Sequence, residues 1–268
     1  MPLLLRRLIG AGWSKPKNPF CGADVAGTVD AVGPGVTKFR VGDVVFGLLR
    51  GTFAEYVCGA EERIVTKPAN VSFEIAAAVP VAAITALQGL RDQGKVKPGD
   101  KVLINGSGGG VGTFAVQIAK AFGAEVTAVC SSRNQEVARS IGADHVVDYT
   151  REDVTTRAER YDVILAVNGN HSMSDYKRVL TPTGVIVVAG GGVRQMLQGS
   201  LLGMLRDKKV RGVMSRPKQE DLLVLKDLLE TGKIAPVIDR TYPLADVAAA
   251  VSYLIEGHSS GKVVITVS

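Results

Sequence analysis

Cysteine is scarce in this chain, and aromatic side chains are few. Its 268 residues include three cysteines, and Phe, Trp and Tyr together make up 5% of the sequence. Cys21, Cys58 and Cys130 lie far apart and form no C-x-x-C pair. This spacing argues against a disulfide framework and predicts buried free thiols in a reducing cytoplasm.

Histidine is equally rare. The three histidines are His145, His171 and His258, and no two of them have the spacing of zinc ligands. Structural and catalytic zinc sites need several closely placed ligands. We therefore interpret each histidine as a surface or structural residue.

Long apolar runs and tracts of one charge are also missing. The apolar start of the chain is interrupted by Arg6-Arg7, and Gly and Pro follow, so neither a signal peptide nor a membrane-spanning helix fits. The net charge is +6, but 32 Lys and Arg are scattered among 26 Asp and Glu, and no basic-aromatic module accompanies them. This pattern favours a solvated basic surface around an anionic cofactor and argues against nucleic-acid binding.

A glycine-rich turn is the most informative feature that the chain does have. The buried-strand pattern Lys101-Val102-Leu103-Ile104-Asn105 runs into Gly106-Ser107-Gly108-Gly109-Gly110-Val111-Gly112, and a helical pattern follows from Thr113. A turn with few side chains lets a diphosphate approach the backbone, and the following helix directs its N-terminal N–H groups at that anion. A strand, a glycine turn and a helix in this order predict dinucleotide binding; a purely structural glycine turn is the alternative.

Strands and helices alternate after this turn. The sequence predicts strands over residues 125–130, 145–149, 161–167, 185–189 and 209–214, and helices over 134–140, 172–180 and 219–230. The strands are near-continuous apolar runs, which is typical of a parallel sheet covered by helices on both faces. The fold class is therefore α/β, with a doubly wound Rossmann sheet.

The two ends of the chain have a different texture. Up to about residue 70 the sequence is turn-rich, with short strands predicted over 24–33, 41–47 and 52–57. An Ala-rich helical stretch over 74–89, broken at Pro80, connects this part to the alternating region. The last part returns to short strands over 237–242 and 262–267, which flank a helix over 245–256.

The end of the second predicted strand bears on the choice of cofactor. A site for NAD usually offers Asp or Glu there to bind the ribose 2′-hydroxyl. This strand ends instead in Cys130-Ser131-Ser132-Arg133, and a guanidinium with hydroxyls suits a phosphate. The missing acid predicts NADPH. In the alternative interpretation, Ser131 and Ser132 cap the next helix and Arg133 is solvated.

Two further segments follow predicted strands at the carboxyl edge of the sheet, where ligands bind in such folds. Asn168-Gly169 comes after the fourth strand, and Gly190-Gly191-Gly192 comes after the fifth. We predict that Asn168 and Gly190 contact the cofactor; simple turns are the alternative.

A series of ordered motifs covers essentially the whole chain. They are Gly22-Ala23-Asp24-Val25-Ala26-Gly27, the Val-Gly-Pro-Gly-Val turn at 32–36, Val41-Gly42-Asp43, Phe53-Ala54-Glu55-Tyr56, Ala76-Ala77-Ala78-Val79-Pro80, Thr85-Ala86-Leu87, the glycine turn, Leu180-Thr181-Pro182-Thr183-Gly184, and Gly257-His258 to Gly261-Lys262-Val263-Val264. The series resembles the zinc-independent quinone oxidoreductase (zeta-crystallin-like) branch of the medium-chain dehydrogenase/reductase superfamily. The resemblance implies a chaperonin-10-like (GroES-like) catalytic domain over 1–84, a Rossmann domain over 85–234 and a return to the catalytic domain over 235–268.

The same resemblance implies roles for three more residues. Tyr149 matches a tyrosine beside the 2′-phosphate, and Thr85 matches a position near the cofactor's phosphates and nicotinamide. Lys262 lies in the closing Gly-Lys-Val-Val motif, from which it can reach the cofactor or substrate cleft. The alternatives are packing for Tyr149, helix capping or core packing for Thr85, and solvation for Lys262.

The resemblance also implies that no zinc is bound. Ala23 stands where the zinc branch has the histidine of its Gly-His-Glu motif, and Val81 stands at another ligand position. Without a Lewis acid, the hydride acceptor must already be electrophilic, as quinones and carbonyl-conjugated alkenes are. The expected activity is NADPH-dependent, enoyl-reductase-type reduction of a quinone or enone. No catalytic residue is assigned, and the Tyr-x-x-x-Lys motif of short-chain reductases is absent.

Three expectations remain. Family members carry further strands and a catalytic loop before the segment that matches Gly22-Ala23-Asp24, so an NADPH-binding protein without turnover is the alternative function. The apolar strand from Val210 to Met214 would be an unprotected sheet edge in a monomer, which predicts a homodimer. A cytoplasmic location fits the free cysteines.

Overall fold

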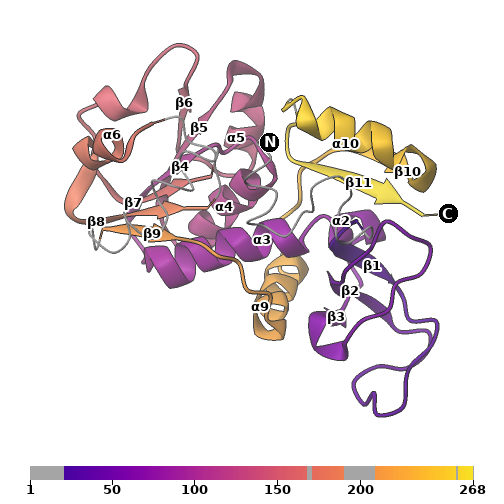
Figure 1. Cartoon of the computed structure of the whole chain (residues 1–268). Helices are drawn as coiled ribbons and strands as arrows, with labels where there is room; N and C mark the ends of the chain where they lie inside the picture. Colours follow the sequence, from indigo (N-terminus) through magenta and orange to yellow (C-terminus); the bar gives the residue numbers. More distant parts are fainter. Residues whose placement is uncertain (1–20, 168–170, 190–208, 258, 268) are drawn as a thin grey trace, which may run out of the picture.

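The computed structural model describes residues 21–167, 171–189, 209–257 and 259–267. A six-stranded parallel sheet forms its centre, and two smaller sheets stand beside it (Figure 1). None of the helices in these ranges combines the length and apolarity that a bilayer crossing requires.

The central sheet has the strand order of a Rossmann fold. Its members are β4 (Lys101–Asn105), β5 (Glu125–Cys130), β6 (His145–Asp148), β7 (Tyr161–Ala166), β8 (Leu180–Val188) and β9 (Val210–Gly212). They lie in the order β6-β5-β4-β7-β8-β9, and every neighbouring pair is parallel. The chain crosses from one half of the sheet to the other between β4 and β7, and ligands of such sheets bind at the carboxyl ends of the strands at this reversal. The predicted doubly wound sheet is confirmed.

Alternating side chains of the strands enter two separate cores. On β4, Val102 and Ile104 join the larger core, whereas Leu103 joins the smaller one. The larger core is covered by α3 (Pro80–Leu87), α4 (Gly110–Ala121), α5 (Gln135–Ser140) and α9 (Gln219–Glu230); α6 (Met173–Arg178) covers the smaller. Burial of both faces explains why the strands carry almost uninterrupted apolar sequences.

The helical stretch before the sheet breaks where the sequence predicted. Helix α2 (Phe73–Ala77) ends two residues before α3, which has Pro80 in its first turn, where a missing N–H costs nothing. The helix then continues beyond its predicted end as η2, a π-helical stretch over Gln88–Gly94 that ends at left-handed Lys95. In this stretch the buried amide of Gln88 donates to Asp221 Oδ2 at 2.7 Å, which fixes the long helix against the start of α9.

The front and the end of the chain lie on the same side of the parallel sheet (Figure 1). The front forms an antiparallel sheet from β1 (Asp24–Thr28), β2 (Val44–Leu48) and β3 (Ile64–Thr66). The end forms β10 (Ile238–Pro243), α10 (Val247–Ile255) and β11 (Lys262–Thr266), and β10 pairs with β11. Phe46 and Val65 of the front sheet share the larger core with the Rossmann helices, so the parts form one packed unit.

Two sequence predictions for the front part were wrong. Residues 52–57 form no strand: among the described residues, Phe53 is the one member of this segment whose amide bonds to a neighbouring segment, at the Cys21 carbonyl. The cysteines form no disulfide with one another, but Cys21 and Cys58 are exposed and only Cys130 is buried.

Candidate functional site

Three glycines of the turn between β4 and α4 differ in what surrounds them. Gly106 has a φ of +91°, which L side chains rarely adopt and which turns the chain sharply. A Cβ on Gly112 would stand 2.1 Å from the Gly106 carbonyl oxygen, so only glycine lets the helix pack this close. A Cβ on Gly109 would meet no atom of the described residues within 4 Å. The turn therefore packs tightly on one side and leaves open space at Gly109, where a ligand can approach the backbone.

The backbone amides of the turn fall into two groups. Those of Gly106 and Ser107 donate to the Val129 carbonyl at 3.1 and 3.0 Å, and the buried Ser107 hydroxyl bonds to the same oxygen. Those of Gly110, Val111 and Gly112 form the first turn of α4, where a helix supplies no acceptor. Gly109 caps the helix without a side chain. These three amides and the positive end of the helix dipole fit an anion such as a diphosphate.

The end of the chain packs directly on this turn. The Gly261 amide donates to the Gly108 carbonyl at 2.9 Å. The Ser260 hydroxyl donates to Asn134 Oδ1 at 2.6 Å, and the Asn134 amide lies against Gly108. Asn134 was missed by the sequence analysis, because nothing in its neighbourhood along the chain indicates that it binds residues 126 positions away.

Lys262 reaches the helix N-terminus from this segment. Its side chain passes Gly110, and its Nζ donates to Asp24 Oδ2 at 2.9 Å; the other Asp24 oxygen accepts from the Val81 amide at 2.7 Å. Both charged side chains are about four-fifths buried, with 19% and 20% exposed. A cation at the positive end of a helix is unfavourable without an anion, and Asp24 supplies that anion here.

The predicted 2′-phosphate residues gather at the carboxyl ends of β5 and β6. Ser132, Arg133 and Tyr149 are exposed, and Ser131 is half-buried. Ser131 begins the next turn without a side-chain capping bond, so the capping alternative is wrong for this residue. The Ser132 hydroxyl donates instead to Asp148 Oδ2 at 2.5 Å.

Asp148 is a carboxylate that the sequence analysis missed. It pairs with Cys130 in the register of β5 and β6, and only 6% of it is exposed. Besides Ser132, the amide and hydroxyl of Thr150 donate to it at 2.9 and 2.7 Å, and Gln135 Nε2 donates at 2.9 Å. Hydrogen bonds from Ser132 and then Thr150 lower the pKa of Asp148 to about 2, so it is ionised at neutral pH.

The remaining predicted residues are placed less directly. The Thr85 hydroxyl donates to the Val81 carbonyl at 2.7 Å, one turn earlier in α3. Its single hydrogen is therefore donated within the helix and not to a ligand. Asn168 and Gly190 lie outside the described residues.

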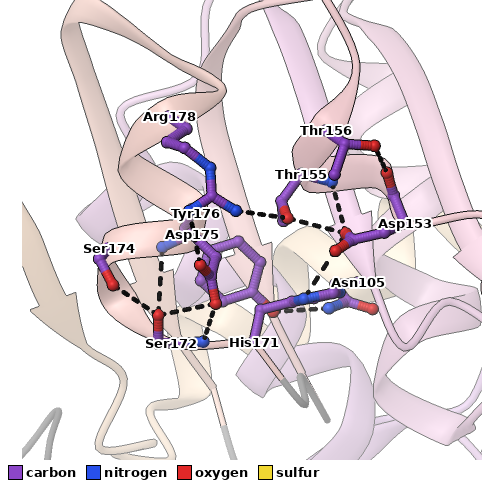
Figure 2. A network of polar contacts seen from close by, with 10 residues as sticks. All are labelled: Asn105, Asp153, Thr155, Thr156, His171, Ser172, Ser174, Asp175, Tyr176 and Arg178. Carbon is purple, nitrogen blue, oxygen red and sulfur yellow. Dashed lines mark hydrogen bonds and ion pairs between the residues drawn. The ribbon is translucent and has the colours of Figure 1, made fainter.

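A polar network holds the end of β4 in place beside the turn (Figure 2). Asn105, the last residue of β4, donates its amide to the Tyr176 hydroxyl at 2.5 Å, and burial raises the pKa of that tyrosine to about 12. His171 packs edge-on against Tyr176, with ring centroids 5.6 Å apart, and its Nδ1 lies 3.7 Å from Asp153. The network is structural: Tyr176 anchors the residue from which the glycine turn begins.

The histidines occupy separate places. His145 is exposed and bonds to Glu125 at 3.0 Å, whereas His171 belongs to the network above; His258 lies outside the described residues. Within the described ranges, no three His, Cys, Asp or Glu side chains are grouped as metal ligands would be.

Two known families match this chain. Residues 5–69 match the alcohol dehydrogenase GroES-like domain, and residues 141–265 match the zinc-binding dehydrogenase family. A chloroplast envelope quinone oxidoreductase homolog of Arabidopsis thaliana is 35% identical over 90% of this chain and 78% of its own length. A chloroplastic NADPH-dependent alkenal/one oxidoreductase of the same plant is 34% identical over 91% of this chain and 63% of its own length.

Solved structures agree with these matches. The quinone oxidoreductase of Coxiella burnetii superposes with a TM-score of 0.83 and 29% identity, covering 100% of this chain and 87% of its own. The likeness extends over the Rossmann sheet and both smaller sheets.

Proposed function

Because this chain belongs to the medium-chain dehydrogenase/reductase superfamily, in its zinc-independent quinone oxidoreductase-like branch, we propose that it uses NADPH to reduce a quinone or an α,β-unsaturated carbonyl. It is an oxidoreductase with a nicotinamide cofactor. The observation that carries the proposal is the space that the described residues leave open at Gly109, in front of a helix without a side-chain cap, at the point where the strand order reverses.

The residues around the turn fit a dinucleotide. The amides of Gly110, Val111 and Gly112 hold the diphosphate. The diphosphate competes with Asp24 for the Lys262 ammonium, which then contributes a positive charge to cofactor binding. Arg133 and Tyr149, which follow β5 and β6, bind the 2′-phosphate. When bound, the nicotinamide supplies a hydride; the chain positions the two substrates and keeps water from the reacting atoms.

NADPH is favoured over NADH by the residues after β5. Arg133 offers paired N–H donors that match phosphate geometry, and β5 itself ends without Asp or Glu. The relative that reduces alkenals and enones is NADPH-dependent by name. In fluorescence titrations we therefore expect tighter binding of NADPH than of NADH.

The class of hydride acceptor is proposed from the residues that stand at the zinc-ligand positions of related enzymes. Ala23 and Val81 stand at two positions where the zinc branch has ligands, so the residues supply no Lewis acid there. Quinones and enones accept hydride without one, because their carbonyls are conjugated. The named relatives are oxidoreductases by name, which favours turnover over an NADPH-binding protein without activity.

A steady-state assay tests this function. The purified chain is mixed with NADPH and either a small quinone or an enone, and nicotinamide absorbance is followed. We expect oxidation that saturates with both substrates. Tight NADPH binding without oxidation of either acceptor would contradict the proposed activity and restore the binding-protein alternative.

Lys262 gives a separate prediction. Lys262→Met keeps the apolar stem beside Gly110 but removes the charge, so we expect a drop in NADPH affinity on the order of tenfold. Asp24→Asn is the matched variant: it frees Lys262 for the diphosphate, and NADPH affinity is expected to stay equal or rise. Equal losses of NADPH affinity in the two variants would show that NADPH binding depends on the Lys262–Asp24 ion pair and not on a contact between Lys262 and the diphosphate.

We also propose a homodimer. In the described part of the chain, β9 pairs only with β8 and forms one edge of the sheet. Met214 just beyond it is 81% exposed, and an open apolar edge favours pairing with a second copy. Light scattering should give about twice the chain mass of 28.2 kDa. Met214→Lys should shift the mass toward one chain; a monomer throughout the micromolar range would reject the dimer.

The remaining assignments are proposals of the same kind. A catalytic part over 1–84, a Rossmann part over 85–234 and a return over 235–268 are consistent with the separate sheets. A cytoplasmic location is proposed from the small number and wide spacing of the cysteines; cell fractionation tests it.

A further inference from the structure

A buried carboxylate lies beneath the hydroxyl that was predicted to bind the 2′-phosphate. Asp148 ends β6, where the register places it opposite Cys130, and the Ser132 hydroxyl donates to its Oδ2 at 2.5 Å. A serine hydroxyl carries one hydrogen and two lone pairs. Because the Ser132 hydroxyl donates its hydrogen to Asp148, it can only accept a hydrogen bond from a group on its solvent-exposed side.

The other donors around Asp148 keep this arrangement fixed. The Thr150 amide and hydroxyl bond to Oδ1 at 2.9 and 2.7 Å, and Gln135 Nε2 bonds to Oδ2 at 2.9 Å. The guanidinium of Arg151 stands 3.7 Å from Oδ2 and is 79% exposed. The carboxylate is thus held in one orientation and charged state. The Ser132 hydroxyl also lies 3.3 Å from the Thr150 hydroxyl, but the ionised Asp148 oxygen at 2.5 Å is the nearer and stronger acceptor for its hydrogen.

The two cofactors differ at the atom that Ser132 faces. NADH presents a 2′-hydroxyl, which can donate a hydrogen, whereas NADPH presents a phosphate whose oxygens only accept at neutral pH. An acceptor-only Ser132 can therefore bond to the hydroxyl of NADH but not to the phosphate of NADPH. Recognition of the phosphate is left to Arg133 and Tyr149.

We propose that Asp148 is a positioning residue that limits the preference for NADPH over NADH by holding the Ser132 hydroxyl as an acceptor. This inference rests on the proposed binding of a nicotinamide dinucleotide. It assigns the cofactor preference of this chain to a residue on β6, in addition to the residues that follow β5.

Asp148→Asn is the direct test. The amide keeps an oxygen toward Thr150 and turns its NH₂ toward Ser132 and Gln135, and the Gln135 amide flips so that its oxygen accepts from this NH₂. Ser132 then accepts from residue 148, and its hydrogen is free for the phosphate. NADPH and NADH affinities are measured by nicotinamide fluorescence, and the readout is their ratio. We expect the ratio to shift toward NADPH on the order of tenfold, the worth of a hydrogen bond to a charged group.

Ser132→Ala separates this effect from the loss of a negative charge. In the natural chain we expect it to change NADPH affinity less than about twofold, because the hydroxyl contributes no hydrogen to the phosphate. In the Asp148→Asn background it should remove most of the gain. An equal gain with and without Ser132 would overturn the proposal, and so would a tenfold loss of NADPH affinity from Ser132→Ala alone.

Asp144→Asn is the matched control. Asp144 stands just before β6 at its other end, about 13 Å from Asp148, and binds Lys120 at 2.8 Å. Asp144→Asn removes the same charge as Asp148→Asn, and the ratio of NADPH to NADH affinity should not change. If Asp148→Asn does not fold, Ser132→Ala still decides, since this exposed side chain tolerates truncation. If neither the natural chain nor any variant binds either dinucleotide, the proposed function itself is contradicted. If they bind but Asp148→Asn leaves the ratio of NADPH to NADH affinity unchanged, only this inference is contradicted.

Discussion

Gly109→Asp is expected to abolish dinucleotide binding while leaving the fold intact or slightly more stable. A Cβ at this position meets no atom within 4 Å in the described part of the chain, and the backbone is extended, with φ −90° and ψ 175°. Asp is a preferred N-cap residue, so its carboxylate can accept from the amides of Val111 and Gly112. Those are the amides proposed for the diphosphate.

The expected changes therefore have opposite signs. We expect NADPH affinity to fall by at least about a hundredfold, because the carboxylate both occupies the amides and repels the phosphates. The melting temperature should stay equal or rise by about 1 to 3 °C. Gly33→Asp is the control, since Gly33 also has open space and an ordinary backbone conformation. Normal NADPH binding by Gly109→Asp would be incompatible with the proposed site.

Gly112→Ala is expected to have the largest effect on stability. Its Cβ would stand 2.1 Å from the Gly106 oxygen and 2.6 Å from the Ser107 Cα, and both are backbone atoms that cannot swing away. Alanine favours a helix over glycine by about 1 kcal/mol, but the collision outweighs this gain. We expect a net loss of about 3 kcal/mol in the free energy of unfolding, measured by urea denaturation.

Gly110→Ala, two residues earlier, is the control for this prediction. Its Cβ would meet the flexible Lys262 stem at 3.0 Å, which can move, so the free energy of unfolding should change by less than about 1 kcal/mol. Similar losses in the free energy of unfolding of both variants would contradict the account in which Gly112 is required for close packing and Gly110 is not.

The sequence predicted the turn and the sheet because both depend on local patterns. The apolar runs and the glycine spacing are properties of neighbouring residues, and they located β4, the turn and α4 to within a few positions. The break at Pro80 was predicted for the same reason. The strand at 52–57 was wrong because alternation of side chains says nothing about whether a partner strand lies beside it.

Contacts between distant segments could not be predicted in this way. Lys262 and Asp24 are 238 positions apart, and Ser132 meets Asp148 only because β5 and β6 pair in one particular register. At the end of β5, where a site for NAD usually has Asp or Glu, the sequence has neither. The structure places one on the neighbouring strand, where it changes what Ser132 can donate.

A crystal structure of the NADPH complex tests the central claim most directly. We predict that diphosphate oxygens lie within hydrogen-bonding distance of the Gly110, Val111 and Gly112 amides, with the diphosphate over Gly109. A complex in which NADPH lies elsewhere, or in which these three amides bond only to protein or water, would contradict the account.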